Sequence, residues 1–149
     1  MRRLRKFWSL TGREKQCFCE AGILLLLATL GVRTIAFKHI DRFLRARWAD
    51  VPLSAFCRAD EIRLVERSVS RAANLLPWKS QCLSRSIAAY IMLRRRGIPA
   101  ALLAGVRVSK DSSLRAHAWV RVGAGVADGT SETAAFTALV RIGQEPVDG

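Results

Sequence analysis

Cys82 and His117 are the side chains of this sequence whose types and surroundings best suit nucleophilic chemistry. Ser80 is a favourable helix N-cap and would place Cys82 at the second helical position, where free backbone N–H groups and the positive end of the helix dipole stabilise a thiolate. Alternation along a strand expected over 114–122 projects His117 from one sheet face, together with Trp119. A thiolate beside an imidazole is a nucleophile with its base. The alternatives are a Cys that fills space as a small apolar side chain and a His with a structural role.

Asp128 is the acid that could complete this group. It follows the glycine turn at 123–125, so the short strand before it would return antiparallel beside His117 and bring a carboxylate to one imidazole nitrogen. The order would then be nucleophile, base and orienting acid. Gln81 could add a side-chain amide to the backbone N–H of Cys82 as an oxyanion donor. Asp128 equally suits the plainer role of a turn aspartate.

Helical patterns fill the chain up to and including the segment that carries Cys82. A capping box at 11–14 predicts the start of a first helix, which runs toward Phe37. A more basic helix is expected over 39–48, and apolar residues three and four apart predict another over 62–76. The arginines off that apolar stripe indicate a solvated face rather than a binding surface. A fourth helix over 81–96 carries Cys82.

Beyond Gly97 and Pro99, which stop that helix, the pattern becomes extended. Apolar or alternating stretches at 101–108 and 114–122, separated by a polar turn, predict two paired strands. A third, short strand is expected at Val126-Ala127. The segment 131–142 suits a closing helix or an edge strand, and both stay open.

These elements predict an α+β fold in one domain over residues 1–149. The part at 1–76 is mainly helical. The part at 77–149 is a catalytic core in which the helix with the nucleophile packs on a small antiparallel sheet.

The composition fits one folded domain that favours acidic partners. Half of the 149 residues are apolar and a quarter are charged, which supplies a core and rules out a disordered tail or a collagen-like repeat. Lys and Arg number 25 against 12 Asp and Glu, a net charge of +13. Nucleic acid, anionic lipid and a carboxylate-rich peptide all suit that charge.

The four cysteines show neither a disulfide framework nor the spacing of a metal site. Cys17 and Cys19 are too close for an ordinary disulfide, and with two histidines in the chain no zinc pattern can be assembled. We therefore expect no metal, and the cysteine usage fits a reducing cytoplasm.

An uncharged stretch at 21–32 follows a basic N-terminus at 1–6. It is shorter than the roughly 20 apolar residues of a transmembrane helix. No small-x-small cleavage site follows it before Arg33. We interpret it as the buried centre of a core helix, while Phe7 and Trp8 beside the basic residues leave peripheral membrane contact open.

Four short motifs follow one another in the second half of the chain. They are Cys82-Leu83-Ser84-Arg85-Ser86, Arg95-Arg96-Gly97-Ile98-Pro99-Ala100, Gly105-Val106-Arg107 and His117-Ala118-Trp119-Val120. In this order they resemble the stand-alone leader peptidases of lasso-peptide biosynthesis, within the transglutaminase-like, papain-related superfamily. The resemblance spans Trp78 to Asp128, and the basic, leucine-rich first half is similar in composition.

The resemblance implies a transglutaminase-like or papain-like core and a triad of Cys82, His117 and Asp128, with a shortened turn at 123–125 bringing the acid into register. It implies hydrolysis of the bond between leader and core in a ribosomally made precursor, without a cofactor. The freed core would pass to a separate ATP-dependent lasso cyclase. The implied partners are the precursor's leader and a separate leader-recognition protein, in a bacterial cytoplasm.

Two other functions remain open. A basic helical module for nucleic acid or membrane, with structural Cys82 and His117, is favoured by the net charge. However, the arginines are spread over every segment without a helix-turn-helix or interleaved aromatics, so nucleic acid is not the expected partner. Acyl transfer or amidase chemistry on another substrate would use the same triad.

Overall fold

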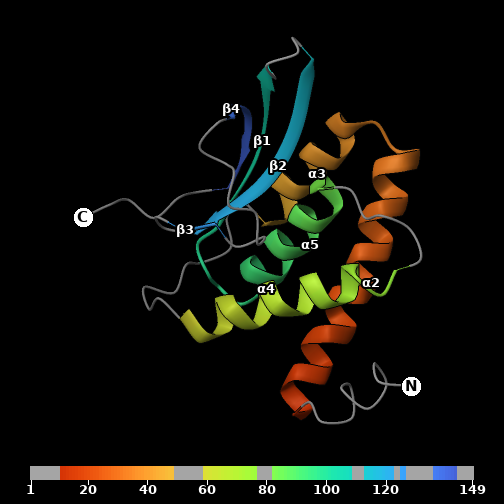
Figure 1. Ribbon diagram of the computed structural model, residues 1–149, viewed down its shortest axis with the longest axis vertical. Coiled ribbons are helices and arrows are strands. Elements are labelled where there is room, and N and C mark those ends of the chain that lie inside the picture. Colours follow the sequence, from red (N-terminus) through yellow and green to blue (C-terminus); the bar gives the residue numbers. More distant parts are fainter. Residues whose placement is uncertain are drawn as a thin grey trace.

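The computed structural model describes residues 11–48, 59–76, 82–108, 113–122, 125–126 and 136–143. Within these residues the chain forms helices followed by an antiparallel sheet (Figure 1), which confirms the predicted α+β fold class. The elements in chain order are α2 (Gly12–Thr34), α3 (Phe37–Trp48), α4 (Ala59–Ala73), α5 (Cys82–Arg95), β1 (Ala101–Val108), β2 (Leu114–Val122), β3 (Gly125–Val126) and β4 (Thr137–Ile142).

The sheet has the strand order β3-β2-β1-β4, with every neighbouring pair antiparallel. The segment whose structure the sequence left open therefore contributes an edge strand, β4. The short strand expected at Val126-Ala127 is observed at Gly125–Val126. In β1 the residue opposite His117 is Gly105.

The two faces of the sheet have different partners. Leu102 and Val120 lie on the face that packs against α5 and belong to the main core with Ile87. The opposite face carries a smaller cluster around Leu103 and Trp119, against which Phe136 packs. The helices thus cover one face of the sheet (Figure 1), as period-two alternation along β1 and β2 requires.

The first helix begins as the sequence predicts. Thr11 and Glu14 form a reciprocal capping box, in which each side chain accepts the backbone N–H of the other residue. The hydrogen bonds with Thr11 lower the pKa of Glu14. The helix ends at Thr34 rather than near Phe37, because Ile35 is already extended.

The interpretation of 21–32 as the buried centre of a core helix is wrong for most of its leucines. One stripe of α2 is buried, formed by Cys17, Ala21, Leu25 and Thr29. Other large apolar side chains stay exposed, because α4 and α5 cover only one side of α2. By length and composition alone, α2 is also the one helix in the described part of the chain that could cross a membrane.

The C-terminus of α5 is fixed by a Schellman motif and by an ion pair to α2. Gly97 has a φ of 69°, and Ile98 donates its N–H to the carbonyl of Leu93 at 3.1 Å. Arg96 contacts the Glu20 carboxylate at 2.6 Å. Burial acts to lower the pKa of Arg96, but the hydrogen bond and charge of Glu20 outweigh it and raise that pKa. These contacts fix the depth at which α5 sits against α2.

Gly105 lets the edge strand β4 approach β1. A Cβ atom at this position would collide with the backbone carbonyl of Thr137, where the register between the two strands shifts at Ala104 and Gly105. A backbone neighbour cannot move aside as a flexible side chain can. The residue type at 105 is therefore set by the packing of β4.

We predict that Gly105→Ala lowers the free energy of unfolding by roughly 1–3 kcal/mol, because β4 must shift to admit the methyl group. Gly22→Ala is the matched control, because the added Cβ meets no atom within 4 Å. Ala is favoured over Gly in a helix interior by about 1 kcal/mol, so the stability of this variant should not fall. Urea denaturation measures both. A Gly105→Ala protein as stable as the parent would contradict the close approach.

Candidate active site

Cys82 is the first residue of α5 and its side chain is half-buried. Backbone N–H groups at a helix start have no partner within the helix, so this end of α5 can receive negative charge. Ser80 and Gln81, the predicted N-cap and oxyanion donor, lie outside the described residues. The position of Cys82 therefore rests on α5 itself, which is buried along most of its length.

His117 lies near the middle of β2 and is also half-buried. Its ring stacks on Trp119, with 6.0 Å between the ring centroids and 14° between the planes. On another side it meets Phe136 in a tilted contact at 5.1 Å. These rings restrict the rotation of the imidazole. The sequence predicted the shared face of His117 and Trp119 but missed Phe136, because a contact between residues 19 positions apart has no local signal.

The structure brings Cys82 and His117 to the wall of one pocket. The pocket has a volume of about 220 Å³ and is otherwise lined by small or apolar residues of α5, β1, β2 and β4. These residues are Leu83, Ala104, Gly105, Val106, Ala116, Ala118, Leu139 and Val140. Two of the three predicted triad residues therefore line one pocket from different elements. The His117 ring itself packs with Trp119 and Phe136 on the sheet face opposite α5, and the catalytic roles of the pair stay a prediction.

A buried hydrogen bond joins the helix that carries Cys82 to the strand that carries His117. Ser86 lies one turn after Cys82 and donates its hydroxyl to the carbonyl of Ala118 at 2.9 Å. Ala118 is the residue after His117. The bond therefore fixes α5 relative to β2, and with them the backbone of Cys82 relative to that of His117. Ser86 belongs to the motif that begins at Cys82, but no local pattern in the sequence signals its hydrogen bond to β2.

The described part of the chain adds no other candidate residue to this pocket. Asp128 lies outside the described residues, as does the neighbouring carboxylate Glu132. Cys17 is buried against Arg96, and Cys19 is exposed on α2. No group of three or more His, Cys, Asp or Glu side chains is arranged to hold a metal ion within the described ranges.

Comparison with known proteins gives one match. A family model described as the transglutaminase-like superfamily matches residues 24–141, which is most of the chain and includes Cys82, His117 and Asp128. No curated protein and no solved structure matches the sequence.

We predict that Ser86→Ala lowers the free energy of unfolding by roughly 1–2 kcal/mol, since it removes a buried hydrogen bond. Ser84 supplies a matched control on the same helix: it is equally buried, and its hydroxyl makes no hydrogen bond among the described residues. Ser84→Ala should be neutral or stabilising. Equal losses for the two variants in urea denaturation would show that the Ser86 hydroxyl does not hold the two elements together.

Proposed function

Because the chain belongs to the transglutaminase-like superfamily, whose members are usually cysteine-dependent enzymes, we propose that it is a cysteine peptidase that removes the leader from a lasso-peptide precursor. The observation that carries the proposal is the pocket that Cys82 and His117 share. The finer substrate assignment is supported by the four ordered motifs between Cys82 and Val120.

The proposed reaction has two steps. The Cys82 thiolate attacks the scissile carbonyl, the bond between carbonyl carbon and nitrogen breaks, and protonated His117 gives its proton to the leaving amine. The core peptide leaves with a free amino terminus, and the leader remains as a thioester on Cys82. His117 then takes a proton from water, whose oxygen attacks the thioester. The leader departs with a carboxyl terminus and the thiolate is restored.

The surroundings of Cys82 and His117 support these roles. Negative charge on the sulfur and on the tetrahedral intermediate develops at the N-terminal end of α5, which favours it. Trp119 and Phe136 pack against the imidazole in one cluster of three rings and restrict its rotation. In this proposal Asp128 orients His117, and Gln81 adds an oxyanion donor. The reaction needs no cofactor and takes place in the bacterial cytoplasm.

Transfer of the acyl group to an amine, or amidase chemistry on another substrate, would use the same thioester. The product distinguishes these reactions, because hydrolysis gives a free carboxyl terminus and acyl transfer gives a conjugate. If the chain is instead a basic binding module, the pocket carries no reaction and a precursor stays intact.

We predict that Cys82→Ala and His117→Ala each lower precursor cleavage by at least roughly a thousandfold, since the nucleophile and its base act as a unit. Mass spectrometry of a lasso-peptide precursor incubated with the enzyme and a leader-recognition protein reads both products. Cys19→Ser changes an exposed thiol on α2 and should cleave at the parental rate. Full cleavage by the Cys82→Ala protein would refute the proposal.

The same assay tests the acid. Asp128→Asn should lower the rate on the order of a thousandfold, because an amide no longer stabilises the imidazolium. Asp111→Asn changes a carboxylate of the polar stretch that precedes β2 in the sequence and should leave the rate unchanged. If Asp128→Asn cleaves at the parental rate while Glu132→Gln does not, Glu132 is the acid.

We also expect cleavage to be slow without the leader-recognition protein. A flexible leader loses conformational entropy when it is ordered in the pocket, and a partner that presents it offsets this cost. Omitting the partner should therefore raise KM much more than it lowers kcat. Equal rates with and without it would show that this chain binds the leader itself. Adding the lasso cyclase should not alter the cleavage rate.

A further inference from the structure

We propose that the chain docks on an anionic lipid bilayer through one apolar surface of its helical half, here called the α2–α3 face. The face consists of the large apolar side chains that α2, α3 and their junction leave exposed. They are Ile23, Leu26, Leu27, Leu30, Ile35 and Phe43, with exposed fractions of 60%, 50%, 58%, 59%, 49% and 60%. Single exposed leucines need no explanation, but a contiguous set of this kind indicates an interaction surface.

Helical geometry makes the α2 members of the set contiguous. Ile23, Leu26, Leu27 and Leu30 recur at steps of three and four, so they lie on one side of α2. The buried stripe that contains Ala21 and Leu25 lies on the opposite side. α2 is therefore apolar on both sides, and the protein's own core accounts for one of them.

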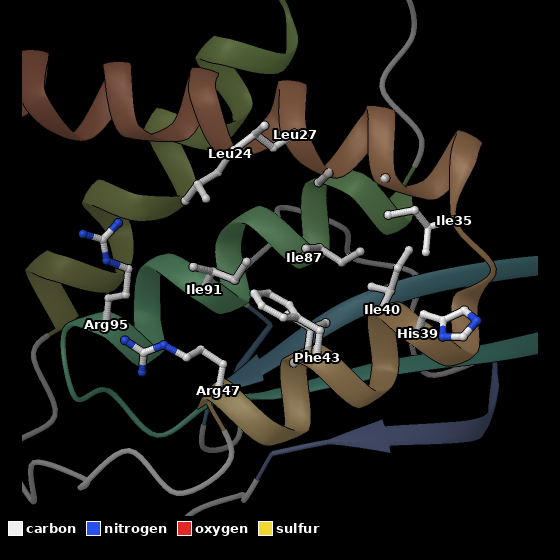
Figure 2. A pocket seen from close by; sticks show the side chains of 13 residues that line it. Leu24, Leu27, Ile35, His39, Ile40, Phe43, Arg47, Ile87, Ile91 and Arg95 are labelled. Atoms are coloured by element: carbon white, nitrogen blue, oxygen red, sulfur yellow. The ribbon is translucent and has the colours of Figure 1, made fainter.

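A groove extends this face between α2, α3 and α5 (Figure 2). It has a volume of about 610 Å³, and Leu27, Ile35 and Phe43 of the exposed set line it. In Figure 2, Leu24 and Leu27 approach the groove from α2, Ile40 and Phe43 from α3, and Ile87 and Ile91 from α5. The groove is thus an apolar hollow of a size that suits an acyl chain.

Basic side chains lie at both ends of the groove and elsewhere on α2 and α3. Arg47 and Arg95 lie at one end of the groove, and His39 lies at the other (Figure 2). Arg33 at the end of α2 and Lys38 and Arg42 on α3 are exposed. Positive charge around inserted apolar side chains matches the phosphates of an anionic bilayer.

The acidic residues near this surface offset only part of its charge. Glu20 pairs with both Arg95 and Arg96, and Asp41 pairs with Arg45. Glu20 thus offsets the charge of Arg95, one of the arginines at the groove, and Asp41 offsets that of Arg45 on α3. In sequence, residues 1–10 add four more basic residues together with Phe7 and Trp8 immediately before α2.

Packing decides that α2 lies along the bilayer surface and does not cross it. The stripe with Cys17 and Leu25 is buried against the rest of the fold, and Arg96 reaches Glu20 on the same helix. A spanning α2 would break these contacts. A second copy of the chain is a poor occupant, because two surfaces of the same positive charge would repel each other.

Docking would leave the candidate active site accessible. Cys82 and Arg95 stand at opposite ends of α5, roughly 20 Å apart by helix geometry. The groove is lined by α5 residues between Ile87 and Arg95, toward the C-terminal end of the helix. The membrane proposal therefore does not depend on the peptidase proposal, and either can fail alone.

Sedimentation with lipid vesicles tests the inference on the full chain. We expect the protein to pellet with vesicles of phosphatidylcholine and phosphatidylglycerol and to bind vesicles of phosphatidylcholine alone roughly tenfold more weakly or worse. Added salt should weaken binding to the anionic vesicles, because salt screens the phosphate charge. No pelleting with either vesicle would overturn the proposal.

Two pairs of variants locate the contact. Leu26→Gln with Leu30→Gln should weaken vesicle binding roughly tenfold. Val108→Gln with Leu114→Gln, which changes even more exposed side chains of β1 and β2, should not weaken it. Arg33→Gln with Arg42→Gln should weaken it roughly tenfold or more, while Arg63→Gln with Arg67→Gln on α4 should have a smaller effect.

If the leucine variant and its control bind vesicles equally, and the arginine variant and its control do so too, the contact lies elsewhere and the α2–α3 face is refuted. Analytical ultracentrifugation of the parent and the leucine variant tests the other possible occupant of the face, a second copy of the chain. A dimer that the leucine substitutions dissociate, without vesicle binding by the parent, would assign the face to a second copy and overturn the lipid proposal.

Discussion

The burial of α5 is the constraint on which the other elements depend. Ala88, Ala89 and Tyr90 at its centre are fully buried, because the sheet covers one side of the helix and α2 and α4 cover the other. Alanines at this point let several backbones approach, and a larger side chain would force them apart. The helix therefore has one depth and one direction in the fold, and Cys82 at its first residue acquires a fixed position from packing far from the pocket.

The second position, that of His117, is fixed by the sheet in a different way. β1 lies between β2 and β4, and the glycine opposite His117 admits β4 to the edge. Ser86 then joins α5 to β2 at the residue after His117. Helix and strand thus meet through the packing of Ile87 and Val120, the buried hydrogen bond of Ser86 and the pocket that Cys82 and His117 line. A change in the packing of α5 or β1 would therefore move Cys82 relative to His117.

The sequence predicted the features that local chemistry determines. The capping box at Thr11, the helix stop at Gly97 and the shared face of His117 and Trp119 all follow from short-range rules, and each is present. The exposed side of α2 could not be predicted, because leucines all round a helix leave no polar side to show which one faces water. β4 and the contact of Phe136 depend on pairing across the chain. Asp128 stays a prediction, since it lies outside the described residues.

The net charge of +13 becomes informative only when it is assigned to places in the fold. Arg94 is buried in α5, so its charge is not presented to a partner. Glu14 and Glu61 pair with arginines across the contact between α2 and α4. These acidic residues are thus paired with arginines inside the helical half. The exposed arginines of α3 lie beside apolar side chains. Composition alone favoured any acidic partner, whereas this arrangement favours one that combines negative charge with an apolar interior.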